Sequence, residues 1–213
     1  MRVLGLVMIA VSVLFSCQKV DWTDLDEDKH QVQQRLDQGE TPLEIYQSGV
    51  PMEHIFGKKY QNGVIFYMNT QTGEGLVCSE SDIFNNGFQS YYNVWGDENF
   101  ALPAGVSLQD GVGAGEHNTS VLAPLSGVNE SVLNEVGTYS GETNWYLPSQ
   151  QELMMIHNNL HRLRLADFSL ELYWTSSVEN DMVICIDFSD NSIANPVVVE
   201  PTAVVRARAV KRF

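Results

Sequence analysis

The sequence predicts a domain of mixed α and β class, and three observations lead to this prediction. Short β-prone runs recur between residues 64 and 213, and in one of them Met182, Ile184, Ile186 and Phe188 occupy alternate positions. An amphipathic helical pattern extends from Ser149 to Leu163. The long stretch 79–128 is rich in Asn, Gly, Ser and aromatic residues without a helical period, which is typical of functional loops.

The N-terminus predicts export and lipidation. A basic start precedes an apolar run from Val3 to Phe15, which is too short to span a bilayer and has the length of a signal-peptide core. The segment Leu14-Phe15-Ser16-Cys17 resembles the bacterial lipobox, so we expect residues 1–16 to be a lipoprotein signal peptide and Cys17 to carry the lipid. The alternative is an N-terminal core helix with a chance cysteine. The expected location is the outer membrane, facing the cell exterior, with its periplasmic face as the other possibility.

The charge balance restricts the partners. The formal net charge is −15, which repels nucleic acid and anionic lipid headgroups, so we expect no nucleic-acid partner and membrane attachment through the lipid on Cys17 alone. Residues 17–40 are acidic and poor in apolar side chains. They predict a solvated tether with one loose helical stretch near Val32 to Leu36.

Short helices and a hairpin follow the tether. Residues 41–57 hold a small Pro/Glu repeat, and Thr41 with Glu44 predicts a capping box at the start of a short helix. Residues 64–68 and 75–78 are β-prone runs around an Asn/Thr/Gly turn, which predicts a two-stranded hairpin.

The C-terminal part predicts one longer helix and several strands. Ser149 and Glu152 form a second capping-box pattern. The apolar face of this helix is expected to consist of Leu153, Ile156, Leu160 and Leu163. Residues 173–177, 182–188 and 204–213 then read as strands.

An ordered set of motifs from residue 57 to the end resembles the Lcl C-terminal-domain family of bacterial surface lipoproteins. The blocks that carry the resemblance are Gly63–Tyr67, Gly73–Val77, Trp95-Gly96, Gly113–Gly115 with Asn118-Thr119, Trp145–Leu153, Tyr173–Ser177 and Arg208–Phe213. A more distant similarity is to formylglycine-generating, sulfatase-modifying enzymes. Both resemblances imply that residues 58–213 form an α+β domain of C-type-lectin-like fold, with a twisted, mostly antiparallel sheet, a few short helices and long loops.

No catalytic or metal-binding residues are assigned. The chain contains no Gly-x-Ser-x-Gly elbow and no cysteine near a candidate base. His157 and His161 lie four residues apart on the predicted helix but have no evident third ligand, so a half-buried structural role is favoured over zinc. We expect no cofactor, and calcium remains an alternative because oxygen-bearing side chains cluster in loops and strand ends: Glu142, Asn144, Glu179, Asn180, Asp181, Asp187, Asp190 and Asn191.

Once Cys17 is assigned to lipid, Cys78 and Cys185 remain. In an exported protein they either pair or act as separate small buried side chains on their own strands. Arg206 and Arg208 are expected to lie against acidic partners, since small alanines flank them.

The predicted function is a non-catalytic, lipid-anchored surface module that binds a glycan or a surface protein. Relatives in the family bind sulfated glycans, but the acidic charge favours neutral sugars that stack on exposed aromatic rings. Trp145 and Trp174 are expected in the core. The alternatives are an enzyme on the same fold and a structural envelope protein. The candidate ligand-binding residues are Tyr91, Tyr92, Trp95, Asn118, Arg162 and Arg164.

Overall fold

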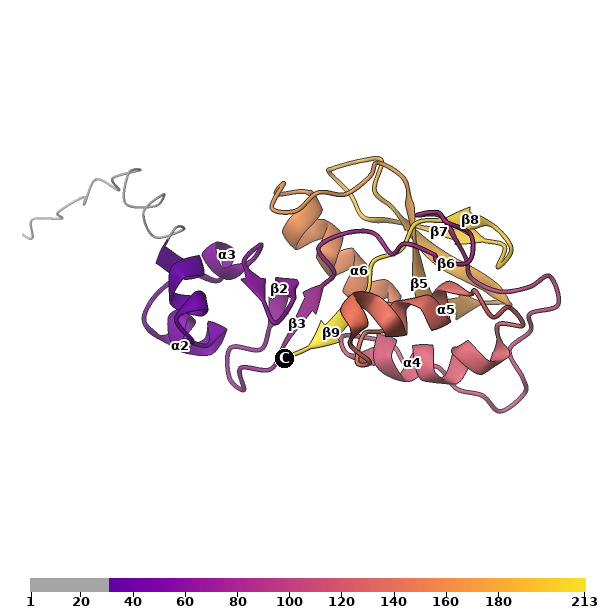
Figure 1. Cartoon of the computed structure of the whole chain (residues 1–213), viewed down its shortest axis with the longest axis horizontal. Coiled ribbons are helices and arrows are strands. Elements are labelled where there is room, and N and C mark those ends of the chain that lie inside the picture. The colour runs from indigo at the N-terminus through magenta and orange to yellow at the C-terminus, as the bar shows by residue number, and fades with distance from the viewer. Residues whose placement is uncertain (1–30) are drawn as a thin grey trace, which may run out of the picture.

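Three antiparallel sheets and several short helices make up the fold in a computed structural model that describes residues 31–213 (Figure 1). This confirms the predicted α+β class with mostly antiparallel strands. The predicted signal peptide, Cys17 and the first part of the tether lie outside the described residues. Within the described part, no helix is long and apolar enough to cross a membrane.

The first sheet joins the predicted hairpin to the C-terminal strand. Its order is β1-β2-β3-β9, and its strands are β1 (Lys59–Tyr60), β2 (Gly63–Met68), β3 (Gly75–Cys78) and β9 (Val210–Arg212). Val64 lies opposite Cys78 in the hairpin, and Val77 lies opposite Lys211 in the pairing of β3 with β9. The end of the chain therefore closes the sheet that the first hairpin begins.

The second sheet has the order β5-β6-β7 and a small β4-β8 pair beside it. Its strands are β5 (Leu172–Glu179), β6 (Met182–Asp187) and β7 (Asn195–Val199), while the pair consists of β4 (Asn93–Val94) and β8 (Val204–Val205). A bridge from Tyr173 to Arg206 connects β5 with the residue that follows β8. The strands predicted at 173–177 and 182–188 are thus confirmed.

Both predicted capping boxes are present. Thr41 caps α2 (Pro42–Gln47), which is followed by α3 (Met52–Ile55), and Ser149 caps α6 (Gln150–Ile156). The α6 helix continues as the π-helical segment η3 (His157–His161) and then ends. Leu163 therefore lies beyond the helix and is exposed, so its expected place on the buried face was wrong.

Four further short helices lie between β4 and β5 in the sequence. They are α4 (Ala114–Leu122), η1 (Ala123–Leu125), α5 (Val132–Glu135) and η2 (Val136–Gly141). The expectation that residues 79–128 contain no helix was therefore wrong. The buried side of α4 includes Asn118 and Thr119, and these polar residues hide its helical periodicity in the sequence.

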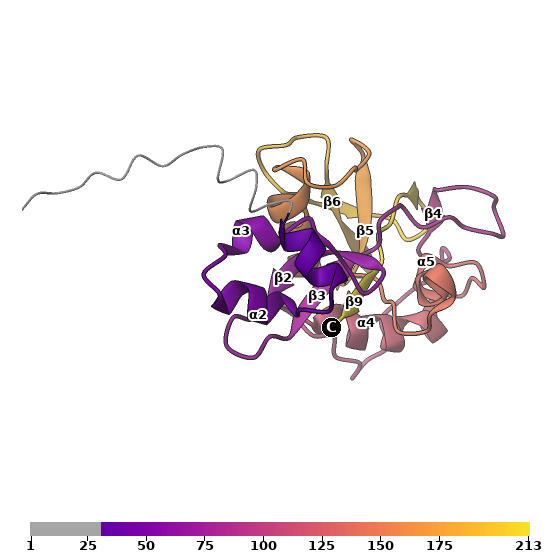
Figure 2. The ribbon, with the colours of Figure 1, turned by 60° about the vertical axis from the view of Figure 1, so that its left-hand side comes forward.

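The expected tether ends earlier than residue 40. Residues 31–37 are helical, and Val32 and Leu36 are buried in the core beside Ile45 and Ile55. The Gln33 side chain exchanges two hydrogen bonds with the backbone of Lys59, at 2.9 and 3.0 Å. Residues 31–40 thus pack against the domain as part of the helical layer with α2 and α3 next to β2 and β3 (Figure 2).

Two hydrophobic clusters fill the interior. Trp174 and Trp145 lie in the larger cluster, as predicted, and Phe66, Tyr173 and Phe188 lie in the smaller one with the apolar face of α6. Cys78 and Cys185 are buried and free, so the expected alternative of a disulfide is wrong and the alternative of separate apolar side chains is confirmed. Burial raises the pKa of Cys78 to about 12.

Candidate functional site

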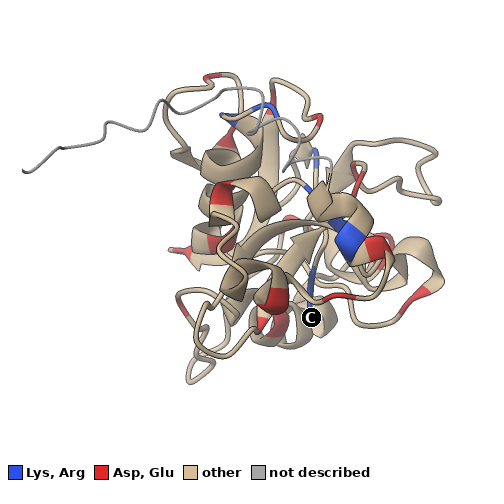
Figure 3. Cartoon of the chain, turned by 90° about the vertical axis from the view of Figure 1, so that its left-hand side faces the viewer, with Lys and Arg blue, Asp and Glu red and all other residues tan. Residues whose placement is uncertain are grey.

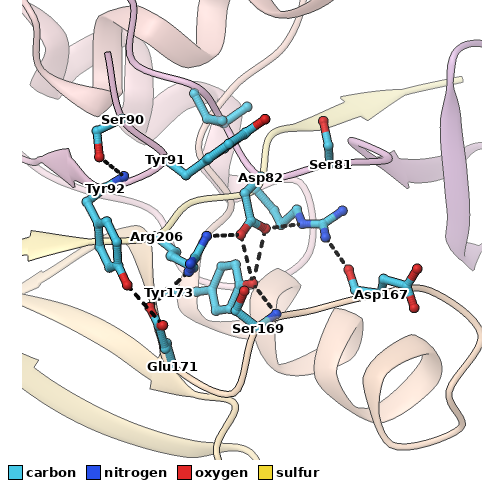
Figure 4. A network of polar contacts seen from close by, with 12 residues as sticks. Ser81, Asp82, Ser90, Tyr91, Tyr92, Asp167, Ser169, Glu171, Tyr173 and Arg206 are labelled. Carbon is cyan, nitrogen blue, oxygen red and sulfur yellow. Dashed lines mark hydrogen bonds and ion pairs between the residues drawn. The ribbon is translucent and has the colours of Figure 1, made fainter. Parts of the chain in front are cut away.

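Two hollows lie on either side of the loop that leads into β4. The first, which we call the polar hollow, has a volume of about 440 Å³ and is lined by Glu80, Ser81, Asp82, Tyr91, Asp167, Phe168, Ser169, Arg206 and Arg208. The second, the apolar hollow, has a volume of about 420 Å³ and is lined by Phe88, Ser90, Tyr92, Val94 and Val204. Tyr91 and Tyr92 are adjacent in the chain, yet each faces a different hollow. In Figure 4 their side chains diverge from the backbone.

Asn85 fixes the loop between the hollows. This residue is buried, donates from Nδ2 to the carbonyl of Glu130 at 2.8 Å and accepts from the amide of Phe88 at 2.9 Å. Its backbone also forms an antiparallel bridge with Ser90. Because each end of the tip is hydrogen-bonded, the loop presents its side chains in a fixed arrangement.

Four large aromatic side chains on this loop are exposed. Phe84, Phe88, Tyr91 and Tyr92, which we call the aromatic ridge, are 38%, 49%, 48% and 40% exposed. The Phe84 and Tyr91 rings pack edge to face with centroids 5.0 Å apart. Burial is the usual state of such rings, so a cluster of exposed ones indicates an interaction surface.

A buried carboxylate organises the floor of the polar hollow. Asp82 accepts from Arg208 Nε at 2.7 Å, from Arg206 Nη1 at 2.9 Å and from the hydroxyl of Tyr173 at 3.0 Å (Figure 4). The amide of Ser169 donates to the same hydroxyl at 2.9 Å. Burial and the neighbouring Asp82 raise the pKa of Tyr173 to about 12, so this hydroxyl stays protonated as a donor.

Arg206 extends the network to the other hollow. Its Nε donates to Glu171 at 2.9 Å, and its guanidinium lies 4.8 Å from the ring centroid of Tyr92, whose hydroxyl donates to Glu171 at 3.0 Å. Burial alone would lower the pKa of Arg206, but hydrogen bonds to Glu171 and Asp82 outweigh it and raise that pKa. The hydrogen bond from Arg206 lowers the pKa of Glu171 in turn. The predicted placement of Arg206 and Arg208 against acids is confirmed.

Two of the predicted ligand-binding residues are buried instead. Trp95 is fully buried, with its ring Nε1 donating to the carbonyl of Thr175 at 2.9 Å, so it cannot stack on a sugar at the surface. Asn118 is also fully buried, and its side chain bonds the amide and the carbonyl of Gln109 at 2.8 and 2.9 Å. The expectation that they contact a ligand was therefore wrong, since both hold a loop to the core.

The other four predicted ligand-binding residues are exposed, but they lie at separate places on the surface. Tyr91 and Tyr92 lie on the aromatic ridge. Arg162 lines a different, open hollow with residues 189–192, and Arg164 lies at the exposed end of the same turn with a left-handed φ of 54°. Neither arginine lines the polar or the apolar hollow.

Three of the acidic side chains considered for calcium are hydrogen-bonded within the protein. Asp187 and Asp190 accept from the amides of Ser189 and Ser192, and Glu142 accepts from Lys211 Nζ at 2.6 Å. Across residues 31–213 no three His, Cys, Asp or Glu side chains are grouped to hold a metal ion.

The two helix histidines are more buried than predicted. His157 is fully buried and its Nε2 lies 2.8 Å from the carbonyl oxygen of Asp190, while His161 is 5% exposed. Both rings pack on Phe188 with centroid distances of 5.0 and 4.9 Å. Both histidines therefore pack against the smaller hydrophobic cluster through Phe188.

No pattern in the sequence assigns Asp82, Tyr173 or Glu171 to this site, because these residues are brought together only by the tertiary fold. The sequence feature that comes closest to predicting this network is the pair Arg206 and Arg208, which were expected to lie against acidic partners. No protein-family model and no curated protein matches the chain. The resemblance to the Lcl C-terminal-domain family therefore stays a prediction.

Proposed function

We propose that the protein is a non-catalytic carbohydrate-binding module, displayed at the cell surface by a lipid on Cys17 and built on the C-type-lectin-like fold that the sequence resemblance implies. The binding site is the polar hollow together with the aromatic ridge. The observation that carries this proposal is the position of Tyr91, whose ring is half exposed beside a hollow with a polar floor.

A sugar requires two kinds of contact, and this site offers both. The apolar C–H face of a pyranose stacks on an aromatic ring, while its hydroxyls need hydrogen-bonding partners. Tyr91 supplies the ring, and Ser81, Asp167 and Ser169 supply polar side chains in the same hollow. The rigid loop lowers the entropy cost of binding, because the ring is already held in place.

The pairing of Asp82 and Glu171 favours binding over catalysis by these two carboxylates. A general acid or base must exchange a proton with its substrate. Both oxygens of Asp82 accept from the Tyr173 hydroxyl, and each also accepts from an arginine. Glu171 is held in the same way by Arg206 and Tyr92. These carboxylates are therefore committed to the structure.

The test is a glycan array with the full-length chain in detergent, followed by titration of any sugar that binds. Tyr91→Ala should weaken the affinity about tenfold or more, because it removes the stacking surface. Tyr46→Ala is the matched control, since Tyr46 is 36% exposed on α2 and lines neither hollow. Absence of glycan binding, or equal binding by the Tyr91→Ala variant, would overturn the proposal. Concentration-dependent self-association without any glycan binding would favour the structural envelope alternative.

A further inference from the structure

Both arginines of the polar hollow are paired with carboxylates. Arg208 uses all three of its guanidinium nitrogens, on Asp82 and on the backbone carbonyls of Ser79 and Asp167. Arg206 uses Nε and Nη1 on Glu171 and Asp82. An anionic ligand would therefore have to compete with Asp82 and Glu171 for these guanidinium groups, which is costly because the pairs with Asp82 are largely buried.

The negative groups are not all occupied. The carboxylate of Asp167 is exposed and forms no hydrogen bond or ion pair with any residue of the described chain. The backbone that carries this side chain is held in place, because Arg208 binds the carbonyl of Asp167 and packs 4.4 Å from the ring centroid of the next residue, Phe168. Asp167 thus offers an unpaired carboxylate on an anchored backbone at the hollow.

The surface around the polar hollow is also negatively charged. Glu80, also at the hollow, pairs with the exposed Lys59. Figure 3 shows acidic residues spread over many elements, whereas basic residues occupy few places. With a net charge of −15, the protein attracts cationic ligands and repels anionic ones at long range.

We infer that the polar hollow selects an oligosaccharide of amino sugars, with one sugar ring stacked on Tyr91 and an ammonium group elsewhere on the same oligosaccharide paired with Asp167. This inference rests on the proposed function and names its ligand class. A sugar is favoured over a lysine side chain because the hollow also holds the hydroxyls of Ser81, Ser169 and Tyr91, which can accept from sugar hydroxyls. A lysine side chain offers only its ammonium group.

Three tetrasaccharides with the same linkage test this inference by calorimetry on the full-length chain in detergent. They are the glucosamine oligomer, its N-acetylated form and the neutral glucose oligomer, compared at about pH 6, where amino groups are protonated. The glucosamine oligomer should bind about fivefold more tightly than the other two, the size of one exposed ion pair. This preference should shrink as salt is added, because salt screens exposed charges.

Asp167→Asn should remove the preference for the glucosamine oligomer and leave binding of the neutral oligomer unchanged. Glu53→Gln is the control, because Glu53 is an exposed carboxylate on α3 that lines neither hollow. Tyr91→Ala should weaken all three sugars equally. This pattern separates the charge contact from the stacking contact.

Equal affinity for the three oligomers, or a preference that survives Asp167→Asn, would overturn the inference while the proposed function stands. Binding of trilysine that depends on Asp167, without binding of glucosamine, would also overturn it in favour of a peptide ligand. If no sugar binds here or on the array, the proposed function itself fails.

Discussion

Arg208 and Asp82 form a buried ion pair with 2.7 Å between Nε and Oδ1, although 126 positions separate them in the sequence. Arg206 binds the other oxygen of the same carboxylate. The pair therefore ties the loop after β3 to the segment before β9 and at the same time makes the floor of the polar hollow. Stability and site geometry depend on one carboxylate.

Asp82→Ala should destabilise the protein by about 3–5 kcal/mol, because it leaves two guanidinium groups without their shared partner. Urea unfolding followed by tryptophan fluorescence measures this change. Asp167→Ala, which removes an exposed and unpaired carboxylate of the same hollow, should change the free energy of unfolding by less than about 0.5 kcal/mol. Equal effects of the two substitutions would contradict the structural role of Asp82.

The parts of the fold that the sequence predicted are those that local interactions determine. The capping boxes at Thr41 and Ser149 each involve residues three apart, and the hairpin of β2 and β3 has a short turn. The α4 helix was missed because Asn118 is part of its buried side. Its polar type conceals the periodicity by which a helix is recognised.

The candidate site was predictable only in part, for a related reason. Exposed tyrosines at positions 91 and 92 could be proposed from a loop-like composition, but the same composition suggested that Trp95 is exposed. Trp95 follows β4, whose pairing with β8 spans a long sequence separation and leaves no local pattern. The meeting of Asp82 with both arginines is likewise a property of tertiary structure.

Trp95→Ala should cost about 3–5 kcal/mol of stability, the usual effect of emptying the space of a large buried ring. Its ring packs edge to face on Phe100, with centroids 4.7 Å apart. Tyr91→Ala, at an exposed ring four positions earlier, should cost less than about 1 kcal/mol. Chemical unfolding of the two variants side by side checks the contrast. A loss of less than about 1 kcal/mol in the Trp95→Ala variant would contradict the burial of this ring.

The thiols of Cys78 and Cys185 should be inert in the native protein. Burial raises the pKa of both, to about 12 for Cys78, so almost no thiolate forms near neutral pH. In a Cys17→Ser variant of the full chain, a thiol reagent should label neither cysteine before unfolding and both after it. Failure to label both in denaturant without reductant would point to a disulfide instead.

Stability should fall as the pH drops below about 6.5 because of His161. Burial and the neighbouring His157 lower the pKa of His161 from its ordinary value of 6.5, so the folded state binds this proton less readily than the unfolded chain. The stabilisation is therefore complete above pH 6.5 and is lost as the pH falls toward the folded-state pKa. Thermal unfolding between about pH 5 and 8 should show a smaller decline for His161→Leu. An unchanged decline would assign it to other groups.

Gly115→Ala should disrupt the contact between α4 and the start of α6. A Cβ at Gly115 would lie 2.4 Å from Glu152 Oε2 and 2.6 Å from the carbonyl oxygen of Leu147. Glu152 cannot move away easily, since it is buried and accepts from the amides of Gly113 and Ser149, both at 2.7 Å. The expected cost is about 1–3 kcal/mol, measured by urea unfolding.

Gly137→Ala is the control for this substitution, because a Cβ there would meet no atom within 4 Å and its backbone φ is not positive. It should leave the stability unchanged or raise it by a few tenths of a kcal/mol, since alanine has less freedom than glycine in the unfolded chain. If both variants behave alike, the close approach of α4 to Glu152 does not hold these helices together. If only Gly115→Ala unfolds at a lower urea concentration, the result supports the buried Glu152 carboxylate as the contact that positions the starts of α4 and α6.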